Sequence, residues 1–191
     1  VYKRQTGTML LGGLAAAEYF GGEIEKLTYE LYEAMNWKWF TNPVTKHPYL
    51  ACYPEDLPKN VPHGINKEGM FGGWSAYSEH IFLYILAAGA PKEEFSTGAD
   101  SYYAMKTYKG SYKGETFIFC GSGAAFTYQW THAFIDFRNL CDKLDRNWFD
   151  NSRHAGLAAR QYAIDNAHRI KGLGPNSWGM SACISPSTGY S

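Results

Sequence analysis

A single carboxyl group, that of Glu79, stands out because it lies within an almost wholly apolar stretch of the 191-residue chain. Residues 68–89 are predicted to form one long helix, and a helix that is hydrophobic all round is a buried helix. Burial favours the protonated form of a carboxyl group, which is the form that a general acid needs. A structural Glu that is hydrogen-bonded to a neighbour fits the same pattern, and this stretch taken alone favours that structural interpretation.

A second group of polar side chains lies in an aromatic-rich stretch, residues 127–142, which is also predicted to be a helix. His132 and Asp136 are four residues apart, so they would share one helix face, and Arg138 follows closely. The pair is either a local polar contact that orients the helix or a histidine held by an aspartate to bind a hydroxyl group. Spacing alone does not separate the two interpretations.

The composition limits the classes of ligand. Lys and Arg together number 18, as do Asp and Glu, so the formal net charge of zero argues against nucleic acid or an anionic membrane as the main partner. Aromatic residues make up 17% of the chain. They form either a core or a platform for a flat neutral ligand such as a sugar. The histidines and cysteines show no metal-ligand spacing, so we predict neither a metal nor a cofactor.

Several further elements must position these groups. Residues 6–20 and 23–40 are predicted to form an antiparallel helical hairpin with a short glycine turn, with Ile24, Leu27, Leu31 and Met35 facing inward. Residues 41–67 form a long loop, and residues 112–120 form a short strand pair or an extended segment. A short helix and loop fill residues 93–109. A last helix spans residues 150–168, with Asp150 or Asn151 as its N-cap.

The predicted architecture is all-α. No internal repeat of fixed period is present, which excludes a standard solenoid. Helical hairpins joined by long loops fit an α/α toroid, in which the loops at one end build a cleft.

Four blocks of sequence resemble the bacterial glucoamylase-like domain family, whose relatives include endo-β-1,2-glucanases and the glucan-processing domain of cyclic β-1,2-glucan synthases. Tyr77-Ser78-Glu79 with the following Tyr84-Ile85-Leu86-Ala87 is similar to the family's Tyr-Asn-Glu and Tyr-Ile-Leu-Ala. Residues 126–138 resemble its Phe-Thr-Tyr-Gln-Tyr-Ser-His-Ala-Trp-x-Asp-Phe-Arg block. Residues 149–166 and 178–190 resemble its last two blocks. The resemblance as a whole covers the chain from about Thr6 to the end.

The resemblance implies an (α/α)6 toroid, of which this chain would supply an N-terminally truncated part. It implies that Glu79 is the general acid of a glycoside hydrolase. With the resemblance, the catalytic interpretation of Glu79 is favoured over the structural one. It also implies a set of residues that bind an oligo- or polysaccharide, namely Tyr77, Tyr128, Gln129, Trp130, His132, Asp136 and Arg138, with Trp178 stacking on a sugar ring.

The start of the chain departs from the family. Residues 1–5 translate GTG TAT AAG AGA CAG, the end of a widely used transposase sequencing adapter, so we predict that they are an artefact and that the domain spans residues 6–191. The family's second acid would fall at about Gln5. Glycoside hydrolysis normally takes two carboxyl groups, so the chain as given should be inactive. Asp56, Asp100 and Asp142 are alternatives for the second acid, but each reads as a loop or surface residue.

Three functions remain open. The first is hydrolysis of a β-glucan, β-1,2-linked by resemblance. The others are transglycosylation of the same glucan and non-catalytic binding of a glycan. The family's usual setting would place the protein in the periplasm or outside a bacterium, although the sequence shows no signal peptide. No run of apolar residues is long enough to span a bilayer.

Overall fold

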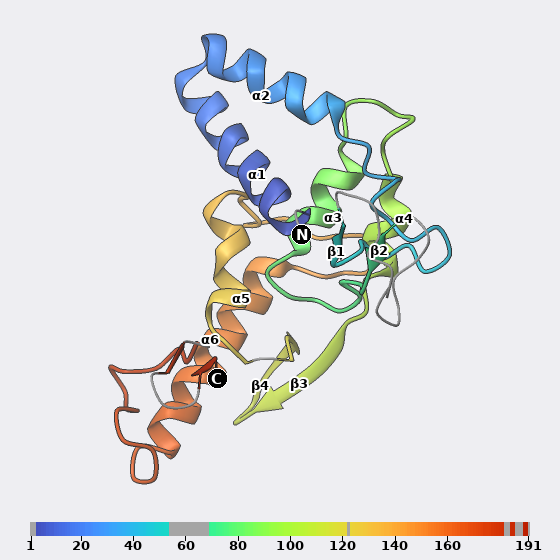
Figure 1. Cartoon of the computed structure of the whole chain (residues 1–191). Helices are drawn as coiled ribbons and strands as arrows, with labels where there is room; N and C mark the ends of the chain where they lie inside the picture. Colours follow the sequence, from blue (N-terminus) through green and yellow to red (C-terminus); the bar gives the residue numbers. More distant parts are fainter. Residues whose placement is uncertain (1–2, 54–68, 122, 182–183, 186–188, 191) are drawn as a thin grey trace. The chain divides into compact units, whose positions relative to one another are not determined.

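The computed structural model describes residues 3–53, 69–121, 123–181, 184–185 and 189–190 (Figure 1). Helices supply most of the regular structure of these residues, and each strand belongs to a two-stranded antiparallel ladder. The helices are α1 (Lys3–Phe20), α2 (Gly22–Ala34), α3 (Ile81–Ala88), α4 (Gly98–Ala104), α5 (Phe126–Gln129), the 3₁₀ helix η1 (Trp130–Ala133) and α6 (Trp148–Asp165). The strands are β1 (Ala51–Cys52), β2 (Met70–Phe71), β3 (Tyr108–Tyr112), β4 (Glu115–Phe119), β5 (Ile184–Ser185) and β6 (Gly189–Tyr190).

The chain divides into two compact units. The N-terminal unit comprises Val1–Ser75 and His80–Lys106, and the C-terminal unit comprises Ala76–Glu79 and Thr107–Ser191. The short segment Ala76–Glu79 therefore belongs to the C-terminal unit, whereas the residues on both sides of it belong to the other.

The predicted helical hairpin is present in the N-terminal unit as α1 and α2 (Figure 1). Gly21 turns the chain with a φ of 62°, a conformation that glycine adopts without strain. Small residues bring the two helices close, since a Cβ added to Gly13 would lie 3.2 Å from Thr28 Cγ2. The second helix ends at Ala34, earlier than the predicted residue 40.

The predicted inward face of α2 is wrong. Ile24, Leu27 and Leu31 are 44%, 51% and 53% exposed, while Thr28 and Tyr32 are the buried residues of this helix. Tyr32 turns inward because its hydroxyl group donates a hydrogen bond to Leu86 O at 2.7 Å. Apolar periodicity located a stripe on the helix but did not show that polar contacts select the opposite side.

The long helix predicted over residues 68–89 is also wrong in its first half. Only Ile81–Ala88 is helical, as α3, and Met70 and Phe71 form β2 instead, paired with β1. Gly72 has a φ of +62°, far from the value of about −63° that a helix needs. A Cβ at Gly72 would lie only 2.8 Å from Leu50 Cβ, so this glycine allows a close approach of two chain segments.

The predicted strand pair is found as the β3–β4 hairpin of the C-terminal unit, but it spans residues 108–119 rather than 112–120, so only β4 lies wholly within the predicted range (Figure 1). Its two turn residues, Lys113 and Gly114, have φ angles of 49° and 91°. Two consecutive residues with positive φ match the turns that suit the right-handed twist of paired strands. The short helix expected within residues 93–109 is found as α4.

The helix predicted over residues 127–142 is not continuous. α5 ends at Gln129, η1 ends at Ala133, and turns follow. Asn139 has a φ of 59°, which no α-helix accommodates. The last predicted helix is confirmed as α6, but its N-cap is Asn147, whose side chain accepts a hydrogen bond from Asp150 N, rather than Asp150 or Asn151.

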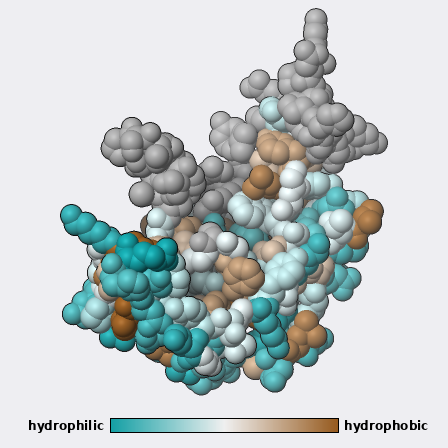
Figure 2. Space-filling model, turned by 90° about the horizontal axis from the view of Figure 1, so that it is seen from below, coloured by the Kyte–Doolittle hydropathy of each residue, from teal (hydrophilic) through white to brown (hydrophobic). Residues whose placement is uncertain are grey.

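Exposed apolar side chains occur in both units. Figure 2 shows one face, on which hydrophobic residues form separate patches among hydrophilic ones. In the C-terminal unit the core is built from Tyr77, Tyr128, Trp148, Ala155 and Ala158, which are each at most 6% exposed.

Candidate active site

Glu79 lies in the turn that immediately precedes α3, and only 5% of its surface is exposed. The Ser78 hydroxyl group donates a hydrogen bond to its carboxyl oxygen Oε2. Its backbone carbonyl accepts a hydrogen bond of 2.8 Å from Thr131 Oγ1. The carboxyl group is therefore buried, as the sequence predicted, but it stands at the start of a short helix rather than in the middle of a long one.

The residues just before Glu79 are fixed by aromatic packing. The Tyr77 ring stacks on the Trp148 ring of α6 with a centroid distance of 4.6 Å and an interplanar angle of 7°. The Arg146 guanidinium also lies over the Trp148 ring, 5.2 Å from its centroid. Burial raises the pKa of Tyr77 and outweighs hydrogen bonds with Ser152 and Asn151, which lower it. The phenol therefore stays protonated at neutral pH. Tyr77 is 3% exposed and packs as core, while its predicted contact with a sugar stays a prediction.

His132 is fixed by α6. The Ser152 hydroxyl group donates to Tyr128 O at 2.6 Å and lies 2.8 Å from His132 Nε2. A serine hydroxyl group has one hydrogen to donate, so it must accept from His132, and the proton of the neutral imidazole is therefore on Nε2. Burial lowers the pKa of His132 and Asp136 raises it, with the net shift downward. The neutral ring thus carries its lone pair on Nδ1, a hydrogen-bond acceptor for a hydroxyl group.

No hydrogen bond joins His132 and Asp136 in the described part of the chain. Asp136 Oδ1 instead accepts from the backbone nitrogen and Nε of Arg138 at 3.0 and 2.8 Å, and Oδ2 accepts from Nη2 at 2.7 Å. The Arg138 side chain holds the pKa of Asp136 at about 2, and the same contact raises the pKa of Arg138. The i,i+4 relation fails because η1 ends at Ala133, before the turn that carries Asp136.

The other predicted sugar-binding residues differ in exposure. Gln129 is exposed, and Trp130 is half-buried against Phe134, with ring centroids 6.5 Å apart. Tyr128 is 6% exposed, and burial raises its pKa to about 12. Trp178 is 40% exposed, so its ring has surface available for a ligand.

The segment that carries Trp178 is tied to the start of α5. Ala125 N donates a hydrogen bond to Met180 O at 3.1 Å, and the Ala125 Cβ would lie 3.3 Å from a Cβ added at Gly179. Gly179 has a φ of +84°, which permits this close approach. The structure thereby brings the Trp178 segment to the same end of α5 as Phe126, while the Asp136–Arg138 pair lies beyond η1.

Three residues of this arrangement were missed as site residues in the sequence. Thr131 and Ser152 make the hydrogen bonds described above, and Trp148 supplies the stacking surface for Tyr77. Ser152 lies within the block of residues 149–166 that resembles the family, which was a usable signal. Thr131 lies likewise within the block of residues 126–138, although its contact with Glu79, more than 50 residues away, leaves no trace in the local spacing.

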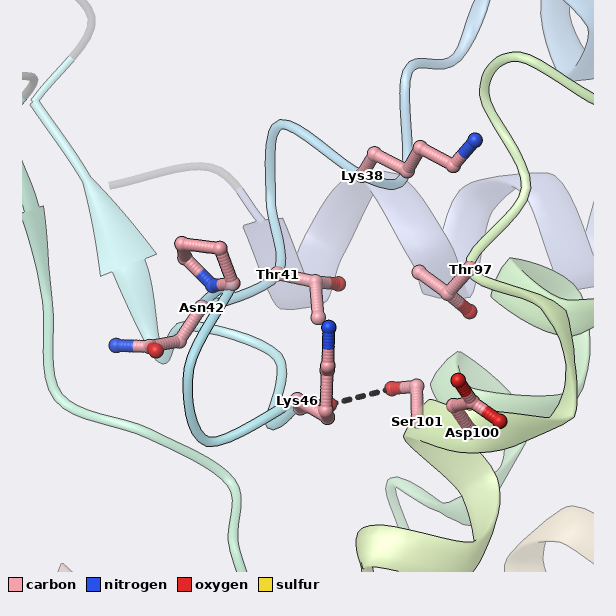
Figure 3. Close-up of a pocket in the computed structure, with 8 residues that line it drawn as sticks. Lys38, Thr41, Asn42, Lys46, Thr97, Asp100 and Ser101 are labelled. Atoms are coloured by element: carbon pink, nitrogen blue, oxygen red, sulfur yellow. Dashed lines mark hydrogen bonds between the residues drawn. The ribbon is translucent and has the colours of Figure 1, made fainter.

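The alternatives for a second acid are placed differently by the structure. Asp142 is not a surface residue, since its side chain is 11% exposed and its Oδ2 lies 2.6 Å from Arg146 Nε. Asp100 lines a hollow of about 230 Å³ in the N-terminal unit (Figure 3). Asp56 lies outside the described residues.

The residues that line the hollow in Figure 3 include none of the predicted site residues. Lys38, Thr41, Lys46 and Ser101 are among the side chains around it, and Ser101 Oγ donates to Lys46 O at 2.6 Å. A second hollow, of about 320 Å³ in the C-terminal unit, includes Tyr128 in its wall. It is largely aromatic and apolar, with Tyr112, Phe117, Phe119 and Tyr162 around an alanine floor from α6.

The described part of the chain shows neither a candidate metal centre nor a candidate membrane span. No set of three or more His, Cys, Asp or Glu side chains there is arranged to hold a metal ion. No helix there has the length and apolar character needed to cross a membrane.

The model of the family described as "Putative glucoamylase" matches residues 72–191, and the chain therefore belongs to that family. The match contains Glu79 and the other predicted site residues. A search of curated proteins returned no match.

Solved structures share the fold. An endo-β-1,2-glucanase from Chitinophaga pinensis, in complex with sophorotriose and glucose, aligns with a TM-score of 0.75 and 24% identity over 97% of this chain and 45% of its own. A β-1,2-glucanase from Parabacteroides distasonis aligns with a TM-score of 0.75 and 20% identity over 96% of this chain and 29% of its own. A protein from Bacteroides caccae described as a putative glucoamylase aligns with a TM-score of 0.73 and 23% identity over 96% of this chain and 45% of its own. The chain thus spans less than half the length of these structures.

Proposed function

We propose that this chain carries part of the active site of a glycoside hydrolase that cleaves a β-glucan, with Glu79 as the general acid. The observation that carries the proposal is a glutamate residue, Glu79, that is 5% exposed and is hydrogen-bonded at both its backbone and its side chain. A buried carboxyl group is costly to a fold unless it is satisfied or used, and such groups gather at active sites. Membership of the glucoamylase family supports carbohydrate as the substrate class.

The β-1,2 linkage is the finer part of the proposal. It is supported by two structural relatives that are described as β-1,2-glucanases, one of them with sophorotriose bound. In this proposal Glu79 protonates the oxygen of the leaving sugar, directly or through a relay. Trp178 and Trp130 offer aromatic faces to sugar rings, and His132 Nδ1 accepts a hydrogen bond from a sugar hydroxyl group.

The second carboxyl group belongs, in this proposal, to residues outside the present sequence. Hydrolysis with inversion needs a base that activates water, and retention needs a nucleophile. The chain spans 45% of the Chitinophaga enzyme, which leaves more than half of that fold to supply it. The chain alone is accordingly expected to be inactive, and the assays below use the protein expressed from the complete gene that carries this sequence.

The test is the release of oligosaccharides from linear β-1,2-glucan by the wild type, Glu79→Gln and Glu115→Gln. General acid catalysis contributes about 10²–10⁴-fold in rate, so Glu79→Gln should lose at least ~100-fold in kcat. Glu115 is the matched control, a half-buried glutamate of the same unit whose amide would keep a hydrogen bond with His154. Its variant should retain the wild-type rate.

Other outcomes separate the alternatives. Retention of full activity by Glu79→Gln would remove the catalytic assignment of this residue. Transfer of glucan to an acceptor sugar, in place of release to water, would make the protein a transglycosylase. Binding of the glucan by the wild type without any cleavage would make it a glycan-binding protein.

A further inference from the structure

We propose that Thr131 is a positioning residue for Glu79. Its hydroxyl group, by bonding the Glu79 backbone carbonyl, fixes the position of the Glu79 carboxyl group. This inference rests on the proposed function and adds to it a residue that acts through the general acid rather than on the substrate.

The contact itself is short and shielded from water. Thr131 Oγ1 lies 2.8 Å from Glu79 O, and the two residues are 4% and 5% exposed. A buried hydrogen bond of this kind is not in competition with solvent, so it holds its geometry. Both residues belong to the C-terminal unit, although they lie in distant parts of the sequence.

The Glu79 carbonyl is suited to this contact because it stands outside the ladder of α3. The first turn of that helix closes from Leu83 N to His80 O at 2.8 Å. The carbonyl of Glu79 lies one residue before that turn and accepts from the Thr131 side chain instead. Its backbone position therefore depends on a partner from another element and not on the helix alone.

Thr131 is itself held firmly, which a positioning residue must be. Its carbonyl accepts from Phe134 N and Ile135 N at 3.1 and 3.0 Å, which closes η1. The next residue, His132, is tied to α6 through Ser152, whose hydroxyl group also bonds Tyr128 O. Hydrogen bonds thus connect the Glu79 backbone, through η1, to α6, the longest described helix of the C-terminal unit.

The segment that carries Glu79 needs such an anchor. Ala76–Glu79 belongs to the C-terminal unit, while Ser75 and His80 on either side belong to the other. Tyr77 is anchored at one end of the segment by its stack on Trp148, and Thr131 anchors the other end. Loss of the second anchor would let the Glu79 backbone, and with it the carboxyl group, move. Misplacement of a catalytic group by about 1 Å can cost ~10²-fold in rate.

The test uses two variants that separate the hydroxyl group from the side-chain shape. Thr131→Val keeps the shape and removes the donor, and Thr131→Ser keeps the donor. In the complete protein, Thr131→Val should lower kcat on β-1,2-glucan by roughly 10- to 100-fold, with KM changed less than about twofold. Thr131→Ser should recover kcat to within about threefold of the wild type. Thr131→Ala, which adds no bulk, replaces the valine variant if the latter does not fold.

A double-mutant cycle with Glu79→Gln then shows whether Thr131 acts through Glu79. If it does, adding Thr131→Val to Glu79→Gln should cause less than about a twofold further loss of rate. An equal loss in the wild-type and Glu79→Gln backgrounds would overturn the positioning role and leave the function of Glu79 intact. Full activity of Thr131→Val would overturn it as well. Full activity of Glu79→Gln would instead overturn the proposed function.

Discussion

Glu79 and Asp136 are two carboxylates of the same compact unit that the structure treats in opposite ways. Glu79 is 5% exposed, and its backbone and side chain are held by hydroxyl groups of Thr131 and Ser78. The Asp136 side chain is 60% exposed and forms a bidentate pair with Arg138, two residues away. The first is positioned by distant elements of the fold, whereas the second is satisfied by its own loop.

The comparison shows why the sequence pattern alone did not distinguish the settings of these two carboxylates. Both carboxylates stand among aromatic residues, and both were predicted to lie within long helices. Neither does, since α3 begins at Ile81, after Glu79, and η1 ends at Ala133, before Asp136. An exposed ion pair contributes little to stability, while a buried carboxyl group is retained only where the surroundings satisfy it or use it. The expected consequences of mutation therefore differ between the two settings.

The packing beneath the Glu79 segment should show the largest effect on stability. Trp148→Ala removes a 3% exposed indole that stacks on Tyr77, and it should lower the free energy of unfolding by about 3–5 kcal/mol. Trp178→Ala is the matched control, since its side chain is 40% exposed, and it should change the stability by less than ~0.5 kcal/mol. Urea unfolding followed by circular dichroism measures both. Equal effects would mean that Trp148 is not part of the core.

His132, between the two carboxylates in sequence, should titrate below its ordinary pKa of 6.5. The folded state then binds fewer protons than the unfolded state, so His132 contributes stability above pH 6.5 that is lost as the pH falls through its lowered pKa. The shift is downward because burial outweighs the charge of Asp136. Nitrogen-15 NMR should show the Nε2–H tautomer at neutral pH. A Nδ1–H tautomer would contradict the hydrogen bond assigned to Ser152.

Loss of the exposed Asp136–Arg138 ion pair should have the smallest effect on stability. Arg138→Gln removes the side chain that holds the pKa of Asp136 at about 2, so that pKa should rise toward 3.8. The lowered pKa gives stability above about pH 4 that is lost as the pH falls through about 2, and the variant should lose that dependence. Carbon-13 NMR of the carboxyl group measures the pKa, and the melting temperature at pH 7 should hardly change. No change in the pKa of Asp136 would show that the pair is absent in solution.

The elements that local pattern could specify were predicted well. The α1–α2 hairpin, α4, the β3–β4 hairpin and α6 all lie close to the predicted residues, since glycine turns and apolar periodicity are local signals. The helix over residues 68–89 failed because apolar composition does not distinguish a helix from the short strand β2 and the partly exposed loop that precede α3. The inward face of α2 failed because Tyr32 bonds a carbonyl of α3, and such long-range partners leave no trace in local spacing.

The site was predicted in part for the same reason. Glu79 was found from its apolar surroundings and from the resemblance of Tyr77-Ser78-Glu79 to a family motif. Its contact with Thr131 joins residues 52 positions apart, which is beyond the reach of periodicity. The roles of Gln129, Trp130 and Trp178 in sugar binding stay predictions.

The most direct test of the central claim varies the leaving group. A general acid matters when the departing oxygen needs a proton, and it matters little for an acidic phenol. For Glu79→Gln in the complete protein, the rate loss should be at least ~100-fold on β-1,2-glucan but less than ~10-fold on a 2,4-dinitrophenyl β-sophoroside. Equal losses on the two substrates, or none on either, would contradict the assignment of Glu79 as the general acid.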